Sequence, residues 1–222
     1  METKIIDTVK IVDIYEKNAN RELAIRMESY MKNHFSFLGI PKPLRAQLSK
    51  PFLKEKTKVK IIDWDFVFQM FEKSEREFQY LAMEYLRKLE KTLQKSDIEM
   101  LEKLIKTKSW WDSVDALAPL VGVLCQKHPE LKEEVLMNWM ESSDIWLKRV
   151  SIIFQLKYKD QTDTEFLKKA ILRNNMTKEF FLNKAIGWAL RQYSKFNPDW
   201  VKIFISTYSL APLSIREGSK YL

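Results

Sequence analysis

Four short segments of this chain share one pattern, an aromatic residue followed four positions later by alanine or valine. The aromatic positions are Phe78, Trp110, Trp146 and Phe181, which are separated by 32, 36 and 35 residues. A pattern that recurs at nearly this interval is typical of helical-repeat proteins, in which each pair of helices buries its apolar face on its neighbours. The repeat therefore predicts a solenoid of stacked helix pairs, with the aromatic residues serving mainly as packing groups.

The composition supports a helical chain. The 222 residues include only four glycines and seven prolines, which leaves few residues for the tight turns of β-hairpins. Leucine, lysine, glutamate, methionine and alanine, which favour helices, are plentiful. We therefore predict an all-α, HEAT-like helical-repeat solenoid that forms a single domain over residues 1–222.

Capping residues and prolines mark the expected helix boundaries. Asn20, Asp63 and Asn197 are good N-cap residues, and Ser74 and Thr177 are further candidates. Residues 55–60 are expected to form a charged linker. The helices expected from the apolar spacing span residues 5–17, 21–32, 43–54, 64–73, 74–93, 97–108, 130–140, 144–158, 162–172 and 177–193, with a segment bent or begun at Pro119 and final helices entered at Pro198 and Pro212.

The charge and the cysteine content limit the possible partners and sites. The formal net charge of +8 favours a polyanionic partner such as nucleic acid, although a merely soluble lysine-rich protein has the same balance. A single cysteine, Cys125, forms no internal disulfide and fits a reducing cytoplasm. The chain has only two histidines, His34 and His128, so a dedicated metal site is not expected. We predict a cytoplasmic protein without a metal or other cofactor.

The run from Lys108 to Asp115 (KSWWDSVD) places two tryptophans beside two aspartates. In a helix, Trp111 and Asp115 lie one turn apart on the same face. An indole ring and a carboxylate both attract positive charge, so this pair predicts a site for something cationic. The alternative is a core tryptophan beside a solvated or capping acid. Asp112 is expected to point away from Asp115 and to have a structural role.

Basic and aromatic residues recur at related places in successive repeats. Trp111, Arg149, Lys157 and Trp188 belong to the same class of helix, and their non-core positions are expected to face one concave groove. Lysine and arginine neutralise phosphates, and indoles pack on sugar or base, so this pattern predicts duplex binding. The alternative is an exposed, solvated helix face. The residues that extend the basic cluster are Lys148, Lys159, Lys184 and Arg191.

Several of these segments closely resemble the AlkD-like family of DNA alkylation repair proteins. The motifs that carry the resemblance are YMKNHFSFLGI at 30–40, KSWWDSVD at 108–115, IWLKR at 145–149 and KAIGW at 184–188. The resemblance implies a C-shaped α-solenoid that holds duplex DNA in a basic concave groove. It also implies a DNA glycosylase that hydrolyses the N-glycosidic bond of cationic N3- and N7-alkylated purines without base flipping.

The resemblance also implies roles for individual residues. Asp115 would be the catalytic carboxylate, which stabilises the oxocarbenium-like sugar and positions the water. Trp111 and Trp188 would pack on the deoxyribose backbone around the lesion. Arg149 and Lys157 would hold phosphates. Tyr30 would approach the lesion from the side of the second helix.

One segment departs from the family pattern. Active members have a helix with prolines and small residues just before the YMKN motif, whereas residues 20–29 here contain no proline and carry Glu22 and Glu28. The alternatives are therefore a divergent, non-catalytic paralogue that binds DNA weakly, or a helical scaffold for another protein. In every case we expect a monomer.

Overall fold

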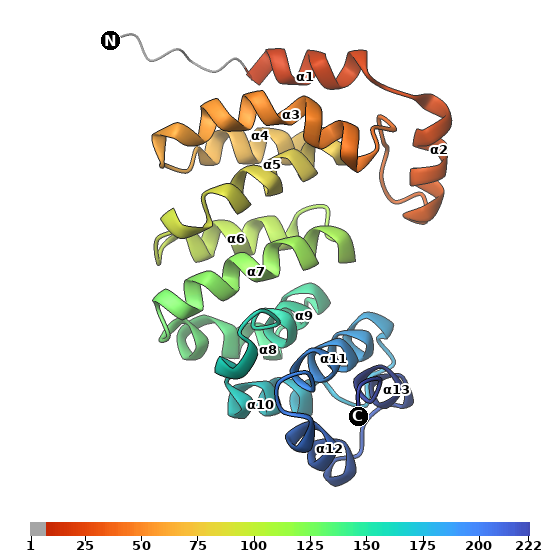
Figure 1. The fold of residues 1–222 in the computed structure, drawn as a ribbon, viewed down its shortest axis with the longest axis vertical. Helices are drawn as coiled ribbons and strands as arrows, with labels where there is room; N and C mark the ends of the chain where they lie inside the picture. The colour runs from red at the N-terminus through yellow and green to blue at the C-terminus, as the bar shows by residue number, and fades with distance from the viewer. Residues whose placement is uncertain (1–7) are drawn as a thin grey trace. The chain divides into compact units, whose positions relative to one another are not determined.

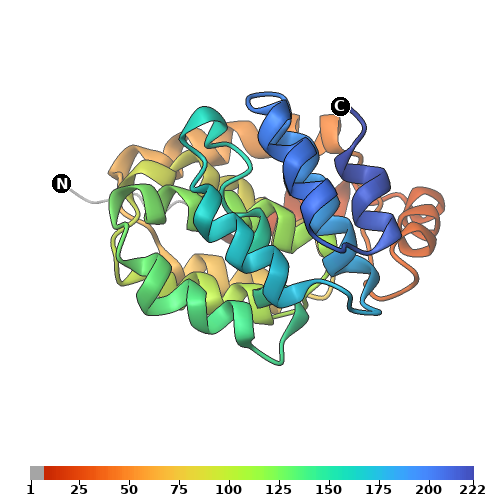
Figure 2. The same ribbon diagram turned by 90° about the horizontal axis from the view of Figure 1, so that it is seen from below.

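The computed structural model describes residues 8–222, and its regular elements there are helices (Figure 1, Figure 2). An isolated parallel bridge joins Ser36 to Glu75, and residues 8–222 contain no strand. None of the helices in the described range is long and apolar enough to cross a membrane. The prediction of an all-α helical-repeat fold is confirmed.

The chain divides into two compact units, Met1–Leu93 and Gln94–Leu222. The prediction of a single domain over residues 1–222 stays a prediction. The described helices of the first unit are α1 (Thr8–Lys17), α2 (Arg21–Tyr30), α3 (Lys42–Lys56), α4 (Trp64–Glu72) and α5 (Arg76–Lys88). Those of the second unit are α6 (Asp97–Lys106), α7 (Trp111–Lys127), α8 (Met137–Glu141), α9 (Ile145–Ile153), α10 (Thr164–Asn174), α11 (Phe180–Tyr193), α12 (Pro198–Thr207) and α13 (Pro212–Gly218).

Three of the predicted N-caps are confirmed. The side chain of Asn20 accepts a hydrogen bond from the backbone N–H of Leu23 at 3.1 Å, at the start of α2. Asp63 caps α4 and Asn197 caps α12 in the same way, with distances of 2.9 and 3.0 Å. These bonds satisfy N–H groups that have no partner inside the helix, so short local sequences suffice to predict them. Residues 5–7 of the first expected helix lie outside the described residues.

The prediction that Ser74 caps the long helix of the first unit is wrong. The backbone N–H of Arg76 donates to the carbonyl oxygen of Ser36 at 2.9 Å, and Glu75 is extended where it pairs with that residue. Because this pairing holds the chain out of helical geometry, α5 begins only at Arg76. The helix also ends at Lys88 instead of Leu93, and a short 3-10 turn follows it.

The expected linker at 55–60 is also more regular than predicted. Helix α3 continues to Lys56, and a 3-10 turn, Thr57–Val59, follows directly. The ammonium group of Lys56 pairs with Asp63 at 2.8 Å and lies 4.4 Å from the ring centroid of Phe66. These contacts stabilise a segment that its charge alone would assign to a loop.

In the second unit, α7 runs through Pro119 without ending there. Proline has no N–H, so Pro119 donates nothing to the carbonyl oxygen of Asp115 one turn earlier. The helix is nevertheless continuous because its apolar face is packed on both sides of the proline, with Leu117 and Leu120 fully buried. The sequence had predicted a bend or a new start at this position.

Other boundaries in the second unit shift as well. The segment expected as one helix over 130–140 contains a π-helical turn, Lys132–Leu136, before α8. The helix expected over 144–158 ends at Ile153. Thr177 does not cap α11, because its hydroxyl accepts from the N–H of Glu179 in the preceding turn and the helix starts at Phe180.

The repeated pattern is a packing device, as predicted. Ala82, Val114, Val150 and Ala185, the small members of the four segments, have no exposed surface. In the second unit, the rings of Trp110, Trp146 and Phe181 form one cluster, with centroid distances of 5.8 Å between the two indoles and 5.1 Å from Phe181 to each. The starts of α7, α9 and α11 therefore meet at a shared aromatic contact.

A buried carboxylate anchors the loop between α2 and α3. The backbone N–H groups of Leu38, Gly39 and Ile40 donate to Glu77 of α5 at distances of 2.8–3.0 Å. Gly39 has a φ of +83°, and a Cβ atom there would lie 2.0 Å from the carbonyl oxygen of Asn20. The loop thus requires glycine both for its backbone conformation and for close packing on α2.

We therefore expect Gly39→Ala to lower the free energy of unfolding by more than about 2 kcal/mol, since it adds backbone strain and a clash with main-chain atoms. Urea unfolding followed by circular dichroism measures the change. Ser36→Ala, an exposed position in the same loop, is the control and should leave the midpoint nearly unchanged. Equal midpoints for Gly39→Ala and wild type would contradict this account of the loop.

Candidate nucleic-acid interface

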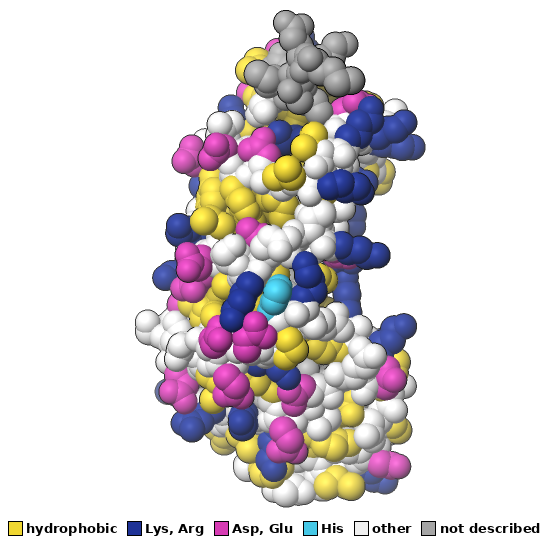
Figure 3. All heavy atoms as spheres, turned by 90° about the vertical axis from the view of Figure 1, so that its left-hand side faces the viewer, with side chains coloured by type: hydrophobic (Ala, Val, Ile, Leu, Met, Phe, Trp, Pro, Cys, Tyr) yellow, Lys and Arg dark blue, Asp and Glu magenta, His cyan; other side chains and the backbone are white. Residues whose placement is uncertain are grey.

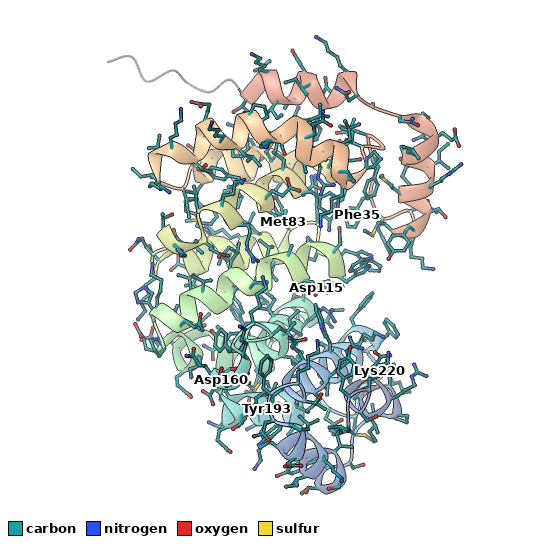
Figure 4. All side chains as sticks on the ribbon, in the orientation of Figure 1. Phe35, Met83, Asp115, Asp160, Tyr193 and Lys220 are labelled. Atoms are coloured by element: carbon teal, nitrogen blue, oxygen red, sulfur yellow. The ribbon has the colours of Figure 1, made fainter. Side chains whose placement is uncertain are left out.

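Asp115 and Arg149 form the best-defined polar contact among the predicted site residues. Asp115 lies in the second turn of α7 (Figure 4), and Arg149 lies in α9. The Nε and Nη2 atoms of the guanidinium donate to Oδ1 and Oδ2 of the carboxylate, both at 2.8 Å. This two-point contact fixes the plane as well as the position of the carboxylate. The Asp115 side chain keeps 18% of its surface exposed, so the carboxylate remains accessible.

The same arginine also reaches a third helix. Its Nη1 atom donates to the backbone carbonyl oxygen of Phe181 in α11 at 2.6 Å. The Arg149 side chain is only 4% exposed, whereas the sequence had predicted a non-core position facing a groove. A buried guanidinium with partners on α7 and α11 is a structural centre as well as a candidate ligand for phosphate. The phosphate-binding role predicted for Arg149 stays a prediction.

The charge of Asp115 depends on opposing effects. Burial raises the pKa of Asp115 above its ordinary value, the Arg149 guanidinium opposes this rise, and the nearby charge of Asp112 adds to it. Asp112 therefore contributes to the electrostatics of the site, beyond the purely structural role expected of it. The site combines a buried ion pair with a second carboxylate close enough to influence it.

The tryptophans predicted beside this carboxylate lie on two different helices, both of which pack against α9. Trp111 is the first residue of α7 and precedes Asp115 by one helical turn, and Trp188 lies in the third turn of α11. Both side chains are half-buried, so part of each indole is available to a ligand. Trp110 instead packs against Trp146 and Phe181, which lie at the starts of α9 and α11. The catalytic roles predicted for Asp115, Trp111 and Trp188 stay predictions.

The other predicted DNA-binding residues differ in exposure. Lys148 is half-buried in α9, and Lys157 and Lys159 are exposed in the segment that follows this helix. Tyr30 is the last residue of α2 in the first unit, and its side chain is exposed. Exposure makes these side chains available to a partner, and their contacts with DNA stay predictions.

Lys184 and Arg191 share a partner that the sequence did not suggest. The buried carboxylate of Glu217, in α13, pairs with Lys184 at 2.9 Å, with Arg191 at 2.6 Å and with Lys220 at 2.9 Å. Lys184 and Lys220 hold the pKa of Glu217 down to about 2. The one available signal is that Glu217 is the only acid in residues 180–193 and 212–222.

No group of three or more histidine, cysteine, aspartate or glutamate side chains suited to a metal is found among residues 8–222. Cys125 lies buried in α7, and burial raises the pKa of its thiol to about 12. Lysine and arginine side chains and aspartate and glutamate side chains both lie at the surface (Figure 3).

The comparisons with known proteins identify the family. The family model described as DNA alkylation repair enzyme matches residues 12–222. The chain belongs to the DNA alkylation repair family. A comparison with curated proteins finds no match. Among solved structures, a predicted DNA alkylation repair enzyme from Enterococcus faecalis is similar, with 38% identity, a TM-score of 0.86, and coverage of 92% of this chain and 96% of the other.

Membership of the DNA alkylation repair family confirms the resemblance inferred from the motifs. The match also includes the whole segment at 20–29 that departs from the family pattern, so the departure does not remove that segment from the family. In this DNA alkylation repair protein, the residues expected to perform the chemistry belong to the second unit, apart from Tyr30.

The buried ion pair gives a prediction for stability. Asp115→Asn leaves the Arg149 guanidinium without a counter-charge and should lower the free energy of unfolding by about 3–5 kcal/mol, the usual cost of breaking a buried pair. Arg149→Met should cost less, because the carboxylate it leaves behind keeps some contact with water. The double variant should lose less than the sum of the two, since the pair acts as one unit.

Urea unfolding of wild type, the two single variants and the double variant measures the coupling between the Asp115 and Arg149 side chains. Arg26→Met is the matched control, because Arg26 forms an exposed ion pair with Glu22 in α2. An exposed ion pair contributes little to the free energy of unfolding, so the urea midpoint of Arg26→Met should barely differ from that of wild type. Additive losses for Asp115→Asn and Arg149→Met would show that the two side chains do not stabilise each other.

Glu217 gives a prediction for pH. Its pKa is about 2 in the folded protein, against an ordinary value of 4.5. A carboxyl group whose pKa falls on folding stabilises the folded state above its ordinary pKa and loses this effect as pH falls toward the lowered value. Wild type should therefore lose stability between pH 4.5 and 2, and Glu217→Gln should lose less over the same window. Identical pH profiles of the unfolding midpoint would contradict the three ion pairs.

Proposed function

We propose that this protein is a DNA glycosylase that hydrolyses the N-glycosidic bond of cationic N3- and N7-alkylated purines in duplex DNA. The observation that carries the proposal is the Asp115 carboxylate, held in a fixed plane by Arg149 one helical turn from Trp111. Family membership supports a role in the repair of alkylated DNA. The specific reaction, the groove and the residue roles are part of the proposal.

The proposed reaction needs little beyond a well-placed negative charge. An alkylated purine is already cationic, so the electron pair of the C1′–N bond passes to the base and neutralises it without a general acid. The sugar becomes cationic at C1′ as the base leaves. Water then forms the new bond at C1′ and gives up a proton. A fixed carboxylate stabilises the developing cation without reorganising, which is the most effective form of electrostatic catalysis.

The contacts around Asp115 suit this role in two ways. The two hydrogen bonds from Arg149 occupy one edge of the carboxylate and leave its other lone pairs for the sugar or the water. Burial raises the pKa of Asp115, so the carboxylate accepts a proton from the attacking water more readily than an exposed aspartate does. Trp111 and Trp188, both half-buried, would hold the flanking deoxyribose against this carboxylate.

The proposed substrate contact is a duplex backbone held by basic residues in a concave groove, with the lesion left in the stack. Because phosphates are neutralised by lysine and arginine, binding should weaken steeply as salt rises. A monomer suffices, since every proposed contact lies in one chain. The basic residues assigned to the backbone are Lys148, Arg149, Lys157, Lys159, Lys184 and Arg191, and Tyr30 is assigned to the side of the lesion.

A second candidate, a DNA-binding member of the family that does not excise bases, is favoured by one observation. Both oxygens of the Asp115 carboxylate are engaged by Arg149, which offsets the negative charge offered to a developing cation. Such a protein would bind DNA in a salt-dependent way and release no base. The excision experiment separates it from the glycosylase.

The test is release of base from a duplex that carries a single N7-methylguanine. Wild type should release the base, and Asp115→Asn should release it at least about a hundredfold more slowly, the usual cost of losing one preorganised electrostatic group. Asp199→Asn, an exposed aspartate in the first turn of α12 that has no part in the proposed interface, is the matched control and should retain most of the activity. Circular dichroism at the assay temperature establishes that Asp115→Asn is folded.

No release by folded wild type that still binds the duplex would favour the non-catalytic member. Undiminished release by Asp115→Asn would remove Asp115 from the mechanism.

A further inference from the structure

The second unit contains a cluster of three cations around one buried acid, and only two of these cations belong to the proposed interface. Lys184 and Arg191 come from α11, and Lys220 follows α13 (Figure 4). The Glu217 side chain is 7% exposed, whereas those of Lys184 and Lys220 are 40% and 48% exposed. The negative charge therefore lies beneath the positive charges, and a solute approaching from water meets the ammonium groups first.

Close packing of α13 on α11 produces this arrangement. Gly187 lies in the middle of α11, and a Cβ atom there would be 2.5 Å from Cβ of Glu217. The buried hydroxyl of Ser214 donates to the carbonyl oxygen of Asn183 at 2.9 Å and fixes the same contact. Because glycine allows the two helices to approach, the short side chain of Glu217 reaches cations one turn before and one turn after Gly187.

The charges of the cluster do not cancel. Three cations against one carboxylate leave an excess of two positive charges. Arg216 adds a further cation to the same short helix, and residues 180–193 and 212–222 contain no other acid. The cluster around Lys95 has the opposite balance of charge, because this one cation pairs with two acids, Glu130 at 3.1 Å and Glu134 at 2.8 Å. An anion is attracted to the first cluster and repelled by the exposed acids of the second.

The cluster also lies beside a residue of the proposed interface. Lys184, Trp188 and Arg191 are separated by four and three residues in α11, so they share one face of the helix. A cluster of cations beside an indole matches a phosphate beside its sugar in a nucleic-acid backbone.

We infer that Lys184, Arg191 and Lys220, held together by Glu217, form a single site for a backbone phosphate next to the sugar that packs on Trp188. The inference rests on the proposed binding of duplex DNA and adds Lys220 and Glu217 to it. The site does not distinguish one DNA sequence from another, since phosphate contacts position the protein on the duplex without identifying bases.

The test is the salt dependence of binding to an unmodified fluorescent duplex, measured by anisotropy. Unmodified DNA keeps the outcome independent of excision. Lys220→Met and Lys184→Met should each weaken binding and reduce the magnitude of the slope of log K against log salt by up to about 0.9, the value for the complete loss of one phosphate contact. Lys202→Met, an exposed lysine of α12, is the matched control and should keep the slope of wild type.

The outcomes separate the two proposals. If wild type binds the duplex and Lys220→Met and Lys184→Met bind it with unchanged affinity and slope, the cluster only packs α13 on α11 and the phosphate site is wrong. An equal loss in Lys202→Met would also overturn it, because general charge would then explain the effect. If wild type shows no affinity at low salt, the proposed function fails together with the site.

Discussion

The buried guanidinium of Arg149 is the interaction on which the second unit depends. It satisfies two oxygens of Asp115 on α7 and one carbonyl oxygen on α11, so three helices are positioned by one side chain. Burying a cation is costly unless its donors find partners, and here three acceptors come from elements that must be packed correctly to provide them. The geometry of the proposed catalytic carboxylate is therefore a property of helix packing, and it is more rigid than a surface aspartate.

The aromatic cluster at the helix starts supports the same arrangement. Trp110, Trp146 and Phe181 meet where α7, α9 and α11 begin, and Arg149 binds the carbonyl oxygen of Phe181 itself. The aromatic residues of the sequence repeat therefore lie next to the ion pair that positions the Asp115 carboxylate. A substitution that loosens the cluster would displace the carboxylate as well as the core, which links stability to the proposed chemistry.

Much of the fold could be predicted from the sequence because its signals are local. The caps at Asn20, Asp63 and Asn197 need only three neighbouring residues, and the one-turn separation of Trp111 and Asp115 needs only helical spacing. What could not be predicted depends on contacts between distant segments. The start of α5 is set by pairing with Ser36, and the burial of Arg149 is set by two other helices. Glu217 lies 26 and 33 residues from the cations of α11 that it holds, so no spacing rule connects them.

Cys125 has a practical consequence for the study of this chain. It is the single cysteine, it is buried in α7 on the same helix as Asp115, and its raised pKa keeps the thiol protonated near neutrality. Thiol reagents attack thiolates, so native protein should stay unlabelled while any opening of α7 exposes a reactive sulfur. The natural residue is thus a reporter of local unfolding in the helix that carries the proposed catalytic carboxylate. A second cysteine introduced on the surface could carry a fluorophore without removing the first.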